Sequence, residues 1–358
     1  MVLCNANAEA IPIFAQRYHL TCETCHSVLP ELNSFGLAFR EHGYQLPLPK
    51  HGTTVVALRY QLEWQQSPVN SRRWTPGGVL LGNLEVGQIT AFAHYNLGAQ
   101  GGPAGLYLGF LAGYNKHTQT LYRAGLFELP LVQSPGQRLD DLQQYGYYGI
   151  HVGLNDLPLS SPRWGFQIER TVANLRLDFI GDDGEFKGAA YGGAPSPTGE
   201  TTSAAHPEFG LFARVRASDN LTVGGEAMTG SRWIVLTGKS GFEDPYTRDG
   251  VFLQFAPGKF QLTAEQWWGS DQNADGFGSA VASSGGYIRA KYYPTPHSYL
   301  GIRYDASANP FITRDFVYYG AFMITPHVRF ILQDVANVGS TSSLGAAFTV
   351  GFPWPLKV

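Results

Sequence analysis

A two-residue hydrophobic period runs through most of this chain and limits what it can fold into. From residue 53 onward, apolar side chains alternate with polar or charged ones in one short segment after another, as where Leu175 and Leu177 enclose Arg176. Successive side chains of a strand point to opposite faces, so this pattern predicts strands with one apolar and one polar face. No convincing long helical pattern interrupts them.

The alternation marks seventeen candidate strands, one of which we expect to be a loop or half-strand, because a barrel with both termini on one side has an even number. The prediction is a mainly β protein, a single-chain transmembrane antiparallel barrel of about 16 strands in residues 52–358. The candidate strands are 53–66, 84–97, 104–114, 120–129, 146–154, 163–169, 174–181, 186–193, 208–217, 220–229, 249–256, 259–268, 283–293, 297–306, 314–324, 327–335 and 341–352.

Composition agrees with a barrel and excludes other classes. The 358 residues include 43 glycines, 22 phenylalanines and 19 tyrosines, with only 15% charged residues, which is unlike a helical enzyme. No apolar run reaches the eighteen or so residues of a membrane-spanning helix, so a helical membrane protein is excluded, whereas barrel strands of about ten alternating residues leave almost no such signal. A net charge of −3 without a basic tail argues against a nucleic-acid partner.

Three features favour a lipid-facing barrel over a soluble sandwich or propeller. Full charges on the polar faces suit a wet lumen, aromatic pairs stand where interfacial girdles are expected, and Leu344–Phe352 places a strand almost at the C-terminus. We therefore expect outer-membrane lipid around the barrel. The charges are Arg176, Asp178, Arg214, Arg216, Glu226, Glu265, Arg289, Arg303 and Asp305, and the pairs are Trp267-Trp268, Tyr292-Tyr293 and Tyr318-Tyr319.

Longer polar gaps between the strands predict loops at 67–77, 130–145, 194–207, 231–248 and 270–282. We expect most of them on the outer surface, as in other barrels. Several carry acids that could gather hard cations or could equally be solvated loop residues. These acids are Asp140, Asp141, Glu243, Asp244, Asp271 and Asp275.

The chemistry of the chain is concentrated near its front, in Cys22-Glu23-Thr24-Cys25-His26. A Cys-x-x-Cys-His run lets two thiols bind the vinyl groups of one haem while the adjacent histidine ligates the iron, so it predicts one covalent haem c on Cys22, Cys25 and His26. A zinc site would need a second Cys or His pair, and a thioredoxin-like pair would sit in a strand-helix unit. The only other cysteine is Cys4, so neither rival has its missing half.

The residues around this motif predict a small helical unit at 11–51. Asn33 or Ser34 can cap a helix that ends near His42, placing Phe35, Phe39 and His42 on one face with Ala38. We expect Phe35 and Phe39 to form apolar walls for the haem and His42 to be its sixth ligand, although His42 could equally be a plain helix-end histidine. The other candidate ligands are His19, His51, Met228 and Met323.

Both borders of the haem segment carry their own signals. Residues 1–10 look like the end of a secretory signal, with a small-x-small pattern at Ala6-Asn7-Ala8, or else like a flexible terminus. Cleavage there would remove Cys4 and agrees with haem attachment outside the cytoplasm. Pro47, Pro49 and Gly52 mark the linker to the barrel, because Pro-x-Pro favours extended chain.

The haem segment resembles that of the fused outer-membrane cytochrome-porins of iron-oxidising bacteria. The resemblance is dense over about forty residues, and over the barrel it is one of character only. It implies a single c-type haem at the front of a porin-like barrel of about sixteen strands, with Fe(II) outside the cell as electron donor. The matching residues are Pro12-Ile13-Phe14-Ala15-Gln16-Arg17, Cys22 to His26, Pro30, Leu32-Asn33, Phe35-Gly36, Phe39 and Gly43-Tyr44.

The residues themselves lead to a related expectation. A single haem with no acid-base pair or nucleophile beside it holds and passes one electron. We therefore expect electron transfer across the bacterial outer membrane, from an extracellular metal ion or small redox donor to a periplasmic c-type cytochrome, with the haem segment in the lumen or at the periplasmic side. The alternatives are a passive porin with a structural haem plug and a haem-based sensor or enzyme; no triad, P-loop or dinucleotide fingerprint supports another enzyme class.

Overall fold

The computed structural model describes most of the chain. The residues that it describes are 12–26, 32–48, 50, 56–66, 73–98, 104–133, 140–143, 145–155, 159–183, 201–235, 240–309, 311–325, 328–338 and 342–354. Three of the expectations above, on residues 1–10, on His51 and on a strand at 186–193, fall outside these residues.

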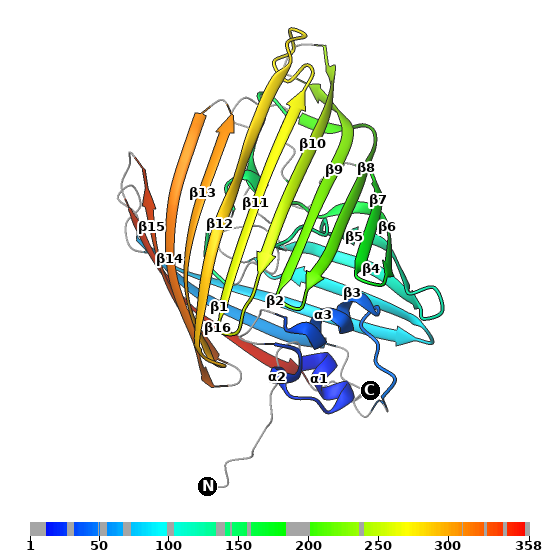
Figure 1. The fold of residues 1–358 in the computed structure, drawn as a ribbon, viewed down its shortest axis with the longest axis vertical. Coiled ribbons are helices and arrows are strands. Elements are labelled where there is room, and N and C mark those ends of the chain that lie inside the picture. The colour runs from blue at the N-terminus through cyan, green and yellow to red at the C-terminus, as the bar shows by residue number, and fades with distance from the viewer. Residues whose placement is uncertain are drawn as a thin grey trace.

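Sixteen antiparallel strands close into one barrel, in which each strand pairs with its neighbours in sequence and β1 pairs with β16 (Figure 1). At this seam Val56 lies opposite Trp354 and Gln66 opposite Leu344. The predicted fold class and strand number are confirmed. The strands are β1 Val56–Gln66, β2 Arg73–Val86, β3 Ile89–Asn96, β4 Gly105–Asn115, β5 Thr120–Phe127, β6 Arg163–Val172, β7 Leu175–Asp182, β8 Thr201–Ser218, β9 Leu221–Val235, β10 Phe242–Phe255, β11 Phe260–Asp271, β12 Val281–Thr295, β13 Ser298–Asn309, β14 Phe311–Thr325, β15 Val328–Asn337 and β16 Ser343–Trp354.

The individual strand predictions were wrong in places. β2 was missed because its start carries Arg73 and the turn-like Pro76, and 67–77 was taken for a loop. Residues 146–154 form no strand; they contain a 3-10 turn, η1 Tyr147–Gly149, whose aromatic side chains are buried. The strands β8, β9 and β10 also extend into the predicted loops 194–207 and 231–248.

Alternation along the strands separates a polar lumen from an apolar outer face. Leu177, Leu211 and Ile288 are exposed on the outside, whereas the neighbouring Asp178 and Arg289 are buried inside. The predicted lumen charges do lie inside, except Arg216, which is exposed at the end of β8. None of the described helices is long and apolar enough to cross a bilayer.

The aromatic pairs do not form simple girdles, because the two members of a pair face opposite sides of the wall. Trp268 and Tyr318 are exposed on the outside, while Trp267 and Tyr319 are buried in the lumen. The girdle prediction was therefore wrong for the inward members, whose rings fill the barrel.

The two rims of the barrel differ. At one rim the described connections are tight, as at residues 87–88, 173–174 and 219–220, and the helices α1 Pro12–Tyr18, α2 Cys22–Cys25 and α3 Ser34–Glu41 lie at this end (Figure 1). Transmembrane barrels of this type turn their short connections toward the periplasm. The helices thus lie at the rim that carries the tight connections.

Candidate functional site

The Cys-x-x-Cys-His motif is held in a fixed position by the start of α3. The side chain of Asn33 accepts a hydrogen bond from the Gly36 amide at 3.0 Å, which caps α3, and donates one to the Thr24 carbonyl at 3.1 Å. The backbone N–H of Asn33 donates a hydrogen bond to the Cys25 carbonyl at 2.9 Å, and the backbones of His26 and Leu32 pair in a short antiparallel bridge. One residue, Asn33, therefore joins the motif to the helix that follows it.

Close packing at Gly36 also holds the Cys-x-x-Cys-His motif against α3. A Cβ atom added to Gly36 would lie 2.2 Å from the Cys25 carbonyl oxygen and 2.9 Å from the Leu32 side chain. Only glycine permits the backbone of α3 to approach α2 this closely.

These residues fit a covalently attached haem. Cys22 and Cys25 begin and end the short helix α2, the three-residue spacing that attachment to one porphyrin requires. Cys25 is a free, half-buried thiol, and burial raises its pKa. His26 follows directly and is half-buried. The two proposed attachment residues and the proposed iron ligand therefore lie within five consecutive residues.

We call the described residues 12–26 and 32–48 the plug, because they pack into the barrel mouth around an aromatic cluster. Phe14 stacks on Tyr44 with ring centroids 5.4 Å apart, and Tyr44 stacks in turn on Phe92 of β3 at 5.8 Å. The edge of the Phe39 ring meets Phe14 at 5.0 Å. A continuous apolar core therefore joins the plug to the wall.

Two ion-pair sites are among the polar contacts that anchor the plug to the wall. On β2, Glu85 accepts a hydrogen bond from the Tyr18 hydroxyl at 3.2 Å and forms an ion pair with Arg17. On β7, Arg176 forms an ion pair with Glu41 at the end of α3. Burial raises the pKa of Tyr18 to about 12, so its hydroxyl remains a donor at neutral pH.

The predicted haem face of α3 divides into two environments. Phe39 is 7% exposed and belongs to the aromatic cluster, whereas Phe35, at 39%, and His42 are exposed. Phe35 and His42 are seven residues apart and so lie on one stripe of the helix, with the half-buried Ala38 between them. The His42 ring lies 4.6 Å from that of Tyr114 on β4.

The other ligand candidates lie in different places. His19 is exposed at the end of α1, with a positive φ of 53°. Met228 is 3% exposed on β9, and Met323 on β14 packs beside a separate apolar cluster. Of the candidates that the structure describes, only His19 and His42 belong to the plug.

A second element fills the lumen from the opposite rim. The described parts of the connection between β5 and β6 (128–133, 140–143, 145–155 and 159–162), which we call the inward loop, place Asp140 and Asp141 inside the barrel, 2% exposed each. The expectation that most such loops lie on the outer surface does not hold for Asp140 and Asp141, because these carboxylates pair with lumen arginines more than 140 residues away.

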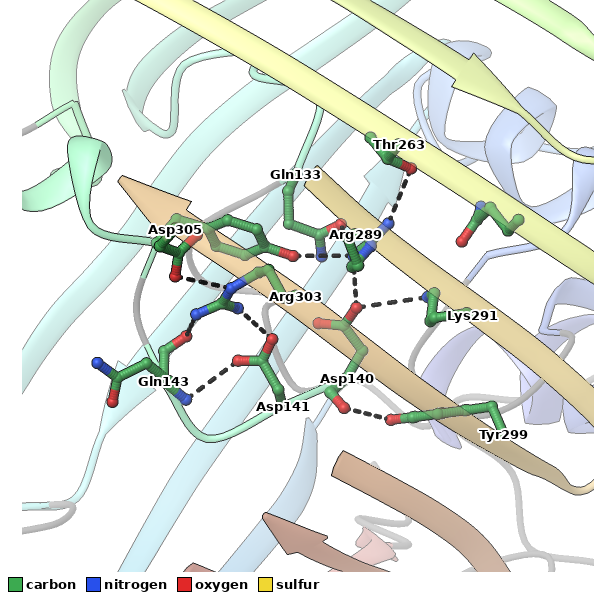
Figure 2. A network of polar contacts seen from close by, with 12 residues as sticks. Gln133, Asp140, Asp141, Gln143, Thr263, Arg289, Lys291, Tyr299, Arg303 and Asp305 are labelled. Carbon is green, nitrogen blue, oxygen red and sulfur yellow. Dashed lines mark hydrogen bonds and ion pairs between the residues drawn. The ribbon is translucent and has the colours of Figure 1, made fainter. Parts of the chain in front are cut away.

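Figure 2 shows this network. Asp140 accepts from Arg289 at 2.6 Å and from Lys291 at 3.4 Å, and its carbonyl accepts from the Tyr299 hydroxyl at 2.6 Å. Asp141 pairs with Arg303, which also donates to Asp305 at 2.8 Å and to the Gln143 carbonyl at 3.0 Å. Because each charge is buried and paired, the network fixes the loop against β12 and β13.

The two loop carboxyls differ in acidity. Burial raises the pKa of Asp141 to about 7, against the opposing effect of Arg303 and with a further rise from Asp140 and Asp305. Burial would also raise the pKa of Asp140, but the charges of Arg289 and Lys291 lower it below its ordinary value. Asp140 is therefore the permanent anion of the pair.

Farther along the inward loop, aromatic side chains also pack against the wall inside the lumen. The Tyr148 hydroxyl donates to Glu265 at 2.6 Å, and the Tyr147 ring stacks on Trp267 at 6.0 Å. Beyond them Asn155 donates to Asp244 and Asp271, both at 2.9 Å. These acids are thus structural partners, and no group of three or more His, Cys, Asp or Glu side chains suited to a metal ion occurs among the described residues.

Comparison with known proteins gives the fold but no family. No family model and no curated protein matches the chain. Among solved structures, the outer membrane channel DcaP of Acinetobacter baumannii is similar with a TM-score of 0.60 at 9% identity, over 83% of this chain and 96% of that one. An anion-selective porin from Comamonas acidovorans gives a TM-score of 0.57 at 8% identity, over 84% and 99%. The chain therefore has the fold of bacterial outer-membrane porins.

Proposed function

We propose that this barrel is an outer-membrane cytochrome-porin that moves single electrons through a haem c carried by its plug. The observation that supports this most is the helical Cys-x-x-Cys-His turn, fixed by Asn33 and Gly36 at the mouth of a transmembrane barrel. When bound, the haem supplies a one-electron redox centre. Cys22 and Cys25 attach it, and His26 ligates its iron.

The plug provides the surroundings that such a centre needs. Phe35 offers an exposed apolar ring next in sequence to Gly36, which packs on Cys25, and His42 directly follows α3 as its C-terminal cap, roughly 9 Å farther along the axis than Gly36. We therefore keep His42 as the proposed sixth ligand. Phe39 acts instead as the core residue that holds α3 against Phe14 and Tyr44.

The position of the plug also indicates how electrons enter and leave. In this proposal the rim with the tight connections faces the periplasm, where a soluble c-type cytochrome can approach the plug, and the lumen leads toward the opposite rim. A donor such as extracellular Fe(II) would be oxidised by one electron, and a periplasmic acceptor would be reduced by one. The inward loop would restrict access from outside to small donors.

An absorption spectrum of the purified membrane protein tests this proposal. We expect a covalent haem c that dithionite and anaerobic Fe(II) both reduce. Cys25→Ala should weaken covalent attachment, and His42→Ala should change the ligand-sensitive bands, whereas His117→Ala, in an exposed turn, should change neither. A colourless wild-type protein would overturn the proposal, and a haem that Fe(II) leaves oxidised would remove iron as donor.

A passive channel is the second candidate, favoured by the similarity to porins, one of which is described as anion-selective. Conductance of the full chain in planar bilayers separates the two functions. A filled lumen predicts little conductance, whereas a passive porin would conduct steadily whatever the redox state. Binding of CO to the reduced protein would instead indicate a five-coordinate haem and favour a sensor or enzyme.

A further inference from the structure

Two glutamates of the barrel wall meet inside the lumen, beside the turn η1 of the inward loop. Glu226 of β9 and Glu265 of β11 are 4% and 3% exposed, and their carboxyls lie within hydrogen-bonding reach of each other. Between them, Gly250 of β10 lies opposite Glu226 on one side and opposite Trp267 on the other. Because glycine carries no side chain, the two carboxyls can approach across β10.

The two carboxyls differ in the hydrogen-bond donors that reach them. Glu265 accepts a hydrogen bond from the Tyr148 hydroxyl of the inward loop at 2.6 Å and another from the Trp267 indole N–H at 2.7 Å. Neither oxygen of Glu226 accepts a hydrogen bond from any N–H or O–H group of the described residues. Donated hydrogen bonds stabilise an ionised carboxylate, so Glu265 is the more favourable site for a negative charge.

The groups around the pair do not favour two negative charges. Arg214 of β8 acts electrostatically on both carboxyls, but also on Asp178 of β7, which is a third carboxylate. Tyr148 of η1 and Tyr287 of β12 complete the surroundings, and a phenol is uncharged at neutral pH. Two like charges in contact at a buried site repel each other, whereas one shared proton replaces this repulsion with a hydrogen bond.

We propose that Glu226 and Glu265 share one proton at neutral pH and that this proton is a pH-sensitive switch for the inward loop. Glu226 is the neutral acid that donates, and Glu265 is the carboxylate that accepts from it and from Tyr148. At alkaline pH the proton passes to water and leaves two buried anions. Their repulsion is relieved when Tyr148 withdraws and water enters. The pair needs no haem, so the switch is independent of the proposed electron transfer.

The direction of the pH effect follows from hydration of the pair. A released loop admits water, which makes the second negative charge less costly, so the pair loses its proton at a lower pH than it does under a seated loop. Both carboxyls belong to the wall and stay adjacent in either state, which places this difference above neutral pH. The ratio of seated to released loop should therefore fall as the pH rises through the alkaline range, by up to about tenfold per pH unit.

Infrared spectroscopy of the full-length protein tests the protonation. Asp141→Asn serves as the background, because Asp141 itself holds a proton near neutral pH. Adding Glu226→Gln should remove the C=O stretching band of one protonated carboxyl at neutral pH. Glu63→Gln is the matched control: Glu63 is also buried but accepts hydrogen bonds from Gln61 and Gln65, so its replacement should leave this band unchanged. An unchanged band in folded Glu226→Gln protein would overturn the proposal.

Limited proteolysis with subtilisin tests the switch, with the protease calibrated on a peptide at each pH and each folded barrel confirmed by heat-dependent migration on gels. Cleavage within residues 145–155 should increase from neutral to alkaline pH in the wild type and in Glu63→Gln. It should stay low in Glu226→Gln, whose amide can donate to Glu265 but cannot ionise. An equal increase in Glu226→Gln would assign the release to another group, such as the Tyr148 hydroxyl, and overturn the proposal. Saturable Mn²⁺ binding that Glu226→Gln abolishes would mean that the pair holds a metal ion, and would also overturn it.

Discussion

Gly36 shows how much a single residue contributes to the plug. The Cys-x-x-Cys-His turn touches α3 at a point where no side chain fits, and Asn33 ties the same two segments by three hydrogen bonds. The motif and its helix could be predicted from sequence because these contacts are local. The burial of Phe39 could not, since its neighbours Phe14 and Tyr44 come from other parts of the plug.

Gly36→Ala should loosen the plug without unfolding the barrel. The added Cβ would collide with the Cys25 carbonyl, and overpacking of this kind costs about 1–3 kcal/mol. Limited proteolysis should cut residues 12–48 faster in the variant, while heat-dependent migration stays unchanged. Gly105→Ala is the control, because its Cβ would meet open space. Unchanged proteolysis of Gly36→Ala would show that the joint tolerates a side chain.

Among the elements, the inward loop departs most from what the sequence predicts. Its acids resemble those of an exposed loop, and only contacts with β12 and β13, which follow much later in the chain, reveal that they are buried. The false strand at 146–154 has the same cause, since Tyr147 and Tyr148 are apolar residues of a lumen filling rather than of a sheet. Periodicity reports which faces are apolar, but not whether a segment pairs with a neighbour.

Acidity of Asp141 should make the loop sensitive to pH. The pKa of about 7 in the lumen exceeds the ordinary value of 3.8, so the seated loop holds a proton that a released loop gives up. The contribution of Asp141 to the free energy that holds the inward loop in the lumen is therefore most favourable at low pH. It weakens as the pH rises toward 7, by at most about 1.4 kcal/mol per pH unit, and changes little above that pH.

Hydrogen exchange of the amides in residues 140–155, corrected for intrinsic rates, measures this effect. Protection should fall between pH 5 and 7 in the wild type and stay nearly constant in Asp141→Asn, which keeps a polar partner for Arg303 without the titrating proton. Asp275→Asn, in the separate loop between β11 and β12, should behave as the wild type does. Protection that increases with pH would contradict the assignment.

At the scale of the whole molecule, the period-two pattern predicted strands with one apolar and one polar face, and the charges, aromatic residues and final strand favoured a barrel with lipid on one side and water on the other. β12 shows both demands side by side: Ile288 is 56% exposed on the outside, and the next residue, Arg289, is buried and paired inside. The pattern alone gave seventeen candidates, and the even number that a barrel needs reduced them to sixteen. The count was right although β2 was missed and 146–154 is no strand. The strand ends were not predicted, since strands that extend past the membrane lose the apolar signal.

A charge on the outer face should destabilise the barrel. Ile288→Arg would place a guanidinium toward lipid at mid-strand, which costs about 2–4 kcal/mol near the bilayer centre. Urea unfolding in phospholipid vesicles should show this loss, and Ile288→Leu should remain within about 1.5 kcal/mol of the wild type. Equal stability of the arginine variant would mean that this face does not contact hydrocarbon.

The seat of α1 has a consequence for the order of assembly. This helix contacts both β1 and β16, so its resting place is complete only after the last strand has closed the ring against the first. The N-terminal helix α1 is synthesised before the barrel, but it is consequently the last element to reach its final packing position. In a protein truncated before β16, α1 would lack one of the two strands that it packs against.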